Sequence, residues 1–203
     1  MKGEIMPWAQ GRGGRPIEMI QPTAKMVDFR AIADNLAQLR RYAGAAEKPV
    51  SVALHTLIVF EAAEDRDKPH ALIHDGHEAH IGEITTPAAQ ALAMLAWLNG
   101  DRERHVERAL TALKEVQDKA IHEAAGLPMP DAARRLRLRK ADLIALQTER
   151  RDFLSECRRP WAPEIEALSP LRKRFRLRSD PDTADELWSK FCRYLPALAA
   201  KAA

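Results

Sequence analysis

Residues 50–63 read VSVALHTLIVFEAA, a helix-forming stretch with apolar side chains on nearly every side. A surface helix keeps one polar face, whereas a helix that is hydrophobic all round is typical of the middle of a bundle. His55 is the exception in this stretch, because an imidazole among Val, Leu and Ile needs a hydrogen-bond partner or a metal ion. The sequence therefore predicts a central helix that holds one polar side chain.

Helical patterns continue on both sides of this stretch. Asp28 is a candidate N-cap, and an apolar stripe with helical spacing follows it to about Tyr42. Strand-like alternation is nearly absent, so we expect an all-α fold, a single helical bundle with a short extended or hairpin-like N-terminal arm. The other expected helices cover residues 69–79, 87–99, 102–125, 131–156 and 182–200. Within one domain of residues 1–203, we expect an arm over 1–27, a core over 28–156 and a C-terminal helical extension over 157–203.

The composition is that of an ordinary globular chain. Hydrophobic residues make up 46% and charged residues 30% of the 203 positions, and the formal charge is only +3. Cys157 and Cys192 lack the CxxC spacing, which favours a reducing compartment without disulfides. The N-terminus has no continuous apolar h-region, and the most apolar stretch, residues 87–98, is too short to span a bilayer. These features predict a cytoplasmic protein with no membrane partner.

Two further patterns each have two interpretations. The Ala- and Leu-rich stretch over residues 87–98 fits a core helix or a helix at a homodimer contact. The basic runs RRLRLRK (134–140) and RKRFRLR (172–178) are typical of nucleic-acid-binding segments. However, acidic residues are almost as numerous as basic ones, 29 against 32, and Phe175 is the one aromatic side chain within these runs. We therefore interpret the runs as solvated faces or a lip that attracts anionic nucleotides, and expect no nucleic-acid partner.

The segment HALIHDGHEAH (70–80) is rich in groups that bind metal ions. On a helix, Glu78 follows His74 by four residues and Asp75 by three, so the three side chains share one face. An ordinary alternative exists for the pair: a partly buried His74 that donates to a backbone carbonyl, and a solvated Asp75. The spacing alone leaves both interpretations open.

A second carboxylate lies in an apolar setting further along the chain. Asp142 is flanked by Ala, Leu and Ile in LRKADLIALQTER (138–150). A carboxylate among apolar residues costs several kcal/mol unless a cation or a metal ion compensates it. The pattern therefore predicts either a metal ligand or an ion pair with Arg139, Lys140 or Arg150.

Three sequence motifs together resemble those of the HD-domain phosphohydrolases: SVALHTLIVF (51–60), ALIHDGHEAHIGEITTP (71–87) and RKADLIALQTERRDF (139–153). The branch to which they are most similar contains the bacterial 5′-deoxynucleotidases and phage and bacterial relatives of unassigned substrate. In that branch a first helix carries His, and a second carries His-Asp with an acid three residues after the Asp. A Gly-acid-Ile-x-x-Pro turn follows, and a later helix carries Ala-Asp-Leu before Thr-Glu-Arg-Arg-Asp. This chain has all of these pieces in the same order.

The resemblance implies one divalent metal ion and a set of residues around it. Two imidazoles and two carboxylates suit Mn, Co, Fe, Ni or Zn better than Ca. Glu78 would be the catalytic acid that orients water and handles its proton, and Glu83 would assist leaving-group protonation or contact the sugar. Arg41 would contact the substrate phosphate, with Arg40 an equally good register. The implied metal ligands are His55, His74, Asp75 and Asp142.

The activity implied by the resemblance is that of a metal-dependent phosphohydrolase. Metal-bound hydroxide would attack the phosphorus of a (deoxy)nucleoside monophosphate or similar phosphomonoester and release phosphate. The alternatives are a phosphodiesterase, a non-nucleotide phosphatase, or a nucleotide-binding scaffold with little turnover. Two departures keep these alternatives open: Glu83 stands where the nucleotidases carry Asp, and Ala45 stands where many relatives carry the His of an RF-x-G-H word.

Overall fold

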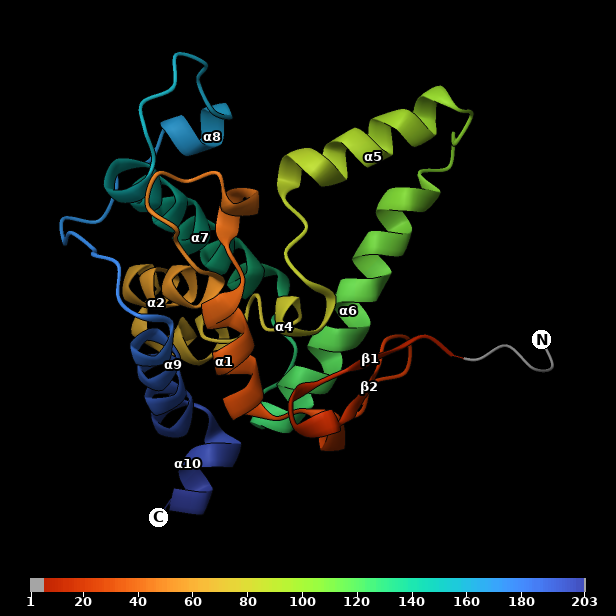
Figure 1. Ribbon diagram of the computed structural model, residues 1–203, viewed down its shortest axis with the longest axis vertical. Coiled ribbons are helices and arrows are strands. Elements are labelled where there is room, and N and C mark those ends of the chain that lie inside the picture. The colour runs from red at the N-terminus through yellow and green to blue at the C-terminus, as the bar shows by residue number, and fades with distance from the viewer. Residues whose placement is uncertain (1–5, 203) are drawn as a thin grey trace.

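Helices make up most of the computed structural model, which describes residues 6–202 (Figure 1). The expected all-α fold is confirmed. The sheet in this part of the chain is one antiparallel hairpin of two short strands. From N- to C-terminus the elements are β1 (Trp8–Gln10), η1 (Arg12–Gly14), β2 (Pro16–Glu18), η2 (Ala24–Met26), α1 (Phe29–Gln38), η3 (Arg41–Gly44), α2 (Val52–Ala62), η4 (Asp65–Asp67), α3 (Lys68–Ala71), α4 (Glu78–Ile81), α5 (Thr86–Leu98), α6 (His105–Ala125), α7 (Ala132–Phe153), α8 (Pro163–Glu166), α9 (Asp180–Tyr194) and α10 (Pro196–Ala202), where η denotes a 3-10 helix.

The N-terminal arm forms the β1–β2 hairpin, and its residues 1–5 lie outside the described part of the chain. The arm is fixed to α6, because Gln117 Nε2 donates to the backbone oxygens of Glu18 and Met19, both at 3.0 Å. Asp28 then caps α1 as predicted, since its side chain accepts hydrogen bonds from two backbone N–H groups of the first turn.

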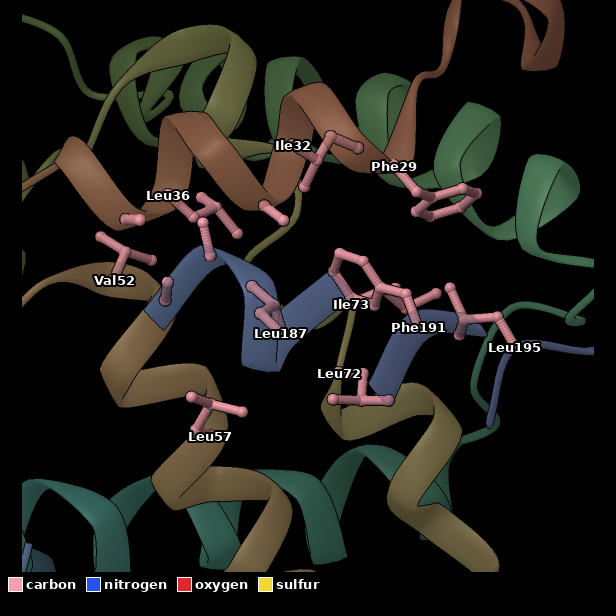
Figure 2. Packing of buried hydrophobic residues seen from close by; sticks show 14 of the residues in the cluster. Phe29, Ile32, Leu36, Val52, Leu57, Leu72, Ile73, Leu187, Phe191 and Leu195 are labelled. Carbon is pink, nitrogen blue, oxygen red and sulfur yellow. The ribbon is translucent and has the colours of Figure 1, made fainter. Parts of the chain in front are cut away.

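The predicted central helix is α2, and its residues 52–60 are all buried. One side of α2, which includes Leu57, packs in a hydrophobic cluster with α1, α6 and α9, whereas the other side, which includes Ile58, packs against α7. Figure 2 shows side chains of α1 facing those of α9 in the first cluster. The C-terminal segment that we expected as an extension therefore contributes to the main core, through Ala184, Leu187, Phe191 and Leu195.

The expected continuous helix over residues 69–79 is wrong. α3 ends at Ala71, α4 begins at Glu78, and the residues between them form turns. Gly76 lies close against α6: a Cβ atom there would be 3.2 Å from the Ile73 oxygen and 3.3 Å from Ile121 Cδ1. A side chain at position 76 would therefore be in tight contact with Ile121 of α6 and with the backbone of the turn.

α1 is also shorter than expected, since it ends at Gln38 rather than near Tyr42. Tyr42 and Ala43 both adopt left-handed backbone conformations, with φ of 59° and 53°. The helix ends before them, because Leu39 and Arg40 are extended, with ψ of 128° and 125°. The chain then turns back toward α2, and Arg40 forms an isolated bridge with Ser51.

α5 and the first half of α6 form a hairpin that projects from the bundle (Figure 1). α5 has no charged residue, and none of its side chains is buried. Of the two interpretations of residues 87–98, the core helix is therefore wrong. None of the described helices combines the length and apolar character that crossing a membrane requires.

The first basic run has partners inside the molecule. Arg134 and Arg137 on α7 both reach the carboxylate of Asp67, with nitrogen–oxygen distances of 3.0 Å and 2.5 Å. Asp67 is buried, so these contacts join the start of α3 to α7.

Candidate metal centre

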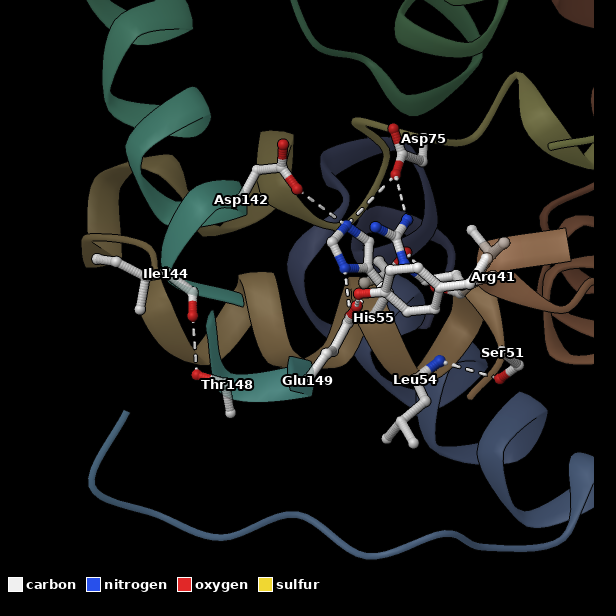
Figure 3. Close-up of polar contacts among 12 residues, drawn as sticks. Arg41, Ser51, Leu54, His55, Asp75, Asp142, Ile144, Thr148 and Glu149 are labelled. Atoms are coloured by element: carbon white, nitrogen blue, oxygen red, sulfur yellow. Dashed lines mark hydrogen bonds and ion pairs between the residues drawn. The ribbon is translucent and has the colours of Figure 1, made fainter. Parts of the chain in front are cut away.

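Two histidines and two aspartates from three separate segments of the chain meet at α2, and Figure 3 shows the carboxylates of Asp142 and Asp75 beside the His55 ring. His55, His74 and Asp142 each offer one ligand atom, and these atoms lie within 4.8 Å of one another. His55 Nε2 is 3.4 Å from His74 Nε2 and 3.2 Å from Asp142 Oδ1. Asp75 Oδ2 is 3.1 Å from His74 Nε2 and 3.5 Å from His55 Nε2. The four predicted ligands thus come together from α2, the α3–α4 turn and α7.

Both histidines are held by the ring nitrogen that points away from this cluster. His74 Nδ1 lies 2.8 Å from the Ala71 oxygen, and His55 Nδ1 lies 2.6 Å from Glu149 Oε1. A carbonyl oxygen can only accept a hydrogen bond, so His74 Nδ1 carries a hydrogen and Nε2, 3.1 Å from Asp75 Oδ2, is the nitrogen that faces the cluster. An imidazole whose second nitrogen donates to a carbonyl or carboxylate is the usual arrangement of a histidine that binds a metal ion. The donor set therefore fits a divalent metal ion.

The charges around His55 also fit a cation. Burial and the Arg41 charge lower the pKa of His55, but the Glu149 and Asp142 carboxylates raise it more, to about 10. Without a metal ion, the imidazole is therefore protonated between carboxylates. Metal binding requires the neutral imidazole, so a divalent cation would displace this proton and take over its positive charge.

Arg41 lies at the cluster and Arg40 does not. Arg41 Nη1 is 4.0 Å from Asp75 Oδ2 and 3.9 Å from Glu83 Oε1, and its side chain is only 11% exposed. Arg40 instead pairs with Asp180 at the start of α9, at 2.6 Å. Of the two registers considered, the structure brings Arg41 and Glu83 together next to the candidate ligands.

Glu78 lies at the start of α4 and is 6% exposed. Its Oε2 atom has no hydrogen-bond partner among the described residues. Burial raises the pKa of Glu78, and the neighbouring Asp75 charge raises it further, to about 7. A carboxyl group with this pKa can change its protonation state near neutral pH.

Glu149 is the residue that our sequence interpretation missed. It is fully buried on α7, and besides His55 it accepts hydrogen bonds from Tyr42 Oη at 2.6 Å and Arg41 Nε at 3.1 Å. Burial raises the pKa of Glu149, but Arg41 and His55 lower it more, to about 2. Glu149 follows Asp142 by seven residues, two helical turns, and this spacing is the signal that could have indicated it.

The arrangement as a whole can hold a divalent metal ion between neutralising and orienting groups. His55 and His74 supply nitrogen, Asp75 and Asp142 supply oxygen, and Glu149 orients His55 from behind. Arg41 beside them provides a positive charge on which an anionic ligand could bind.

The chain is similar to two curated proteins, neither of which has a name that states an activity. One is an uncharacterized protein of Rhodobacter capsulatus, 28% identical over 153 residues that cover 70% of each chain. The other is the uncharacterized protein YfdR of Escherichia coli K12, 31% identical over 122 residues that cover 60% of this chain and 58% of YfdR. No protein-family model matches the chain.

Proposed function

We propose that this chain is a metal-dependent phosphohydrolase of the HD-domain type that releases phosphate from a nucleoside monophosphate or a similar phosphomonoester. The observation that carries the proposal is the meeting of His55, His74, Asp75 and Asp142 beside Arg41. The proposal is also supported by the order of the sequence words that resemble this class of enzymes.

His55, His74, Asp75 and Asp142 would hold the ion. When bound there, a divalent ion supplies Lewis-acid chemistry, which activates water and offsets phosphate charge. The donor set of two nitrogens and two carboxylates suits Mn, Co, Fe, Ni or Zn.

The remaining residues have separate roles in this proposal. Arg41 binds the phosphate, because its buried guanidinium is the positive group beside the cluster. Glu78 accepts the proton of the attacking water. Burial raises the pKa of Glu83, which favours the protonated form that donation to a leaving group needs. Glu149 holds the His55 ring in orientation.

The test is phosphate release by chelator-stripped protein, before and after addition of each divalent metal, across a panel of nucleoside monophosphates. We expect release only with metal, and its loss in His74→Ala and Asp142→Asn. Release by the stripped protein, or equal release by these variants, would overturn the proposal. A diester that leaves a monophosphate product would identify a phosphodiesterase, and tight nucleotide binding without turnover under every metal would identify a binding scaffold.

We also propose that α5 contacts a second copy of this chain. Its five large apolar side chains are each 50 to 63% exposed, which amounts to on the order of 500 Å² of apolar surface, as much as the largest patch of a typical monomer. A two-fold axis through this helix doubles the area, to on the order of 1,000 Å², the lower bound of a specific interface before any flanking residue is added. The five are Leu92, Met94, Leu95, Trp97 and Leu98.

The charged residues next to the exposed side chains of α5 suit a second copy of this chain better than a partner whose surface is only acidic or only basic. A recess of about 830 Å³ between α5 and α6 has apolar walls on α5 and both acidic and basic groups on α6. In an isologous interface the same surface patch of both copies meets, so a rim that carries both signs can place acidic groups of one copy against basic groups of the other. The rim residues of this kind are Arg104, Glu107 and Lys114.

A further inference from the structure

Two buried polar atoms beside the candidate centre have no hydrogen-bond partner among the described residues. They are Nε2 of His77 and Oε2 of Glu78, and their residues are only 5% and 6% exposed. Because neither atom has a partner, the two are not bonded to each other. A buried polar group left unpaired costs about 1–3 kcal/mol, so two of them in adjacent residues indicate a shared partner that is not among the described residues.

The His77 ring is oriented as a metal-binding histidine would be. Its Nδ1 lies 2.9 Å from Oδ1 of Asp118 on α6. A carboxylate that engages one ring nitrogen fixes the ring and makes the other nitrogen a better ligand, and here that other nitrogen is the unpaired Nε2. The close packing of Gly76 against Ile121 on the same helix holds the turn in the position where His77 meets Asp118.

We propose that Asp75, His77 and Glu78 form a second divalent-cation site next to the first group. Their ligand atoms lie within 4.8 Å of one another. One imidazole and two carboxylates suit a transition ion such as Mn²⁺ or Co²⁺. This site shares Asp75 with the four ligands of the proposed phosphohydrolase, whereas His77 and Glu78 are not among them. It depends on ion binding alone, not on the reaction.

Asp75 joins the two sites. Its contacts with His55, His74 and Arg41 all go through Oδ2. A carboxylate has two oxygens, so Oδ1 is free to face the second ion while Oδ2 serves the first. With both ions bound, Glu78 is a ligand of the second ion.

The test counts ions in the full chain. Chelator-stripped protein is titrated with Mn²⁺ and, separately, with Co²⁺, and bound metal is measured by calorimetry and by elemental analysis after desalting. We expect about two ions per chain in the unaltered protein and about one in His77→Gln, because a ligand lost from a site removes most of its affinity. Magnetic coupling between two Mn²⁺ ions, seen by electron paramagnetic resonance, should disappear in the same variant.

The matched control is His80→Gln, three residues further on. His80 Nδ1 is bonded to Gln117 and His80 is not part of the proposed site, so this variant should retain about two ions. Asp118→Asn is a second test that leaves His77 in place, and it should weaken the second ion by roughly 10- to 100-fold. It keeps the proposal testable if His77→Gln fails to fold.

The outcomes separate this proposal from the proposed function. One ion per chain in the unaltered protein, lost in His55→Gln and kept in His77→Gln, overturns the second site and leaves the first intact. Two ions that persist in His77→Gln overturn it as well. An ion that is lost in His77→Gln and kept in His55→Gln supports the site described here and contradicts the ligand set of the proposed phosphohydrolase.

Discussion

Glu149 is reached by three groups at once, the His55 imidazole, the Tyr42 hydroxyl and the Arg41 guanidinium. It therefore connects a candidate metal ligand with the arginine proposed to bind phosphate. Removal of its charge should affect both, although Glu149 itself touches neither ion nor substrate in the proposed site.

We predict that Glu149→Gln weakens binding of the first metal ion by roughly 10- to 100-fold, the usual effect of losing a group that orients a metal-bound histidine. Competition with a metal-sensitive dye measures this affinity. Glu166→Gln is the control. Glu166 lies on α8 and pairs with Arg150, which is on the same helix as Glu149, but Glu166 is not part of the cluster. Equal affinities in the unaltered protein and Glu149→Gln would contradict the role given to Glu149.

Arg41 and Arg40 form a natural pair for comparison. We predict that Arg41→Gln lowers kcat/KM for a phosphomonoester by on the order of 10²- to 10³-fold, as expected when a group that stabilises developing charge is removed. Arg40→Gln should stay within a few-fold, because that guanidinium is bound to Asp180. Metal content is measured in both variants, since Arg41 also contacts Glu149. A similar loss in both variants would show that Arg41 has no special role.

The need of a single polar residue for a partner could be predicted where its sequence neighbours are apolar. His55 and Asp142 are polar groups among apolar neighbours in the sequence, so a compensating partner could be expected for each. Glu149 stands in the charged stretch TERRD (148–152), where a carboxylate is expected to be solvated. Its burial depends on how α7 packs on α2 and η3, which the local pattern does not contain.

At the scale of elements, the helical prediction failed at the candidate metal centre. His74 and Asp75 were expected on a helix, but they lie in the turn between α3 and α4. Helical spacing still grouped them with Glu78, because the turn also follows a compact path. Within the break, Gly76 packs closely against Ile121 of α6, a tertiary contact that local periodicity does not show.

At the same scale, the ion pairs of Asp67 with α7 lead to a prediction about stability. Hydrogen bonds from Arg137 and Arg134 lower the pKa of Asp67 from 3.8 to about 2, against the opposing effect of burial. A carboxylate with a lowered folded-state pKa adds stability above its unfolded pKa, and that contribution is lost as the pH falls through its folded pKa. The contribution here is about 2 kcal/mol at neutral pH.

Asp67→Asn should therefore lower the free energy of unfolding by about 2 kcal/mol at pH 7, measured by urea denaturation. The difference from the unaltered protein should shrink as the pH falls from about 4 to about 2, where Asp67 becomes protonated in both states. Asp65→Asn is the control, because Asp65 is highly exposed and pairs with Lys68 rather than with α7. A difference that stays constant over this pH range would contradict the ionic origin of the effect.

At the scale of the whole molecule, the position of α2 could be predicted and that of α5 could not. Both stretches are apolar on most sides and both have a side-chain N-cap, Ser51 for α2 and Thr85 for α5, but α2 is enclosed between two clusters. α5 follows the turn at Gly82 and leaves the bundle with α6. An apolar pattern shows that a helix must be covered, but it does not show whether the same chain or another one covers it.

The last prediction concerns what packs on α5. If α5 packs on a second copy, the unaltered protein should have the mass of two chains in size-exclusion chromatography with light scattering at micromolar concentration. Leu95→Glu should reduce this to one chain, because a carboxylate in the centre of an apolar interface is desolvated without a partner. Leu136→Glu on α7 is the matched control, since Leu136 is also exposed, at 69%, but lies on another helix. A single-chain mass for the unaltered protein, or a two-chain mass for Leu95→Glu, would rule out α5 as the contact between copies.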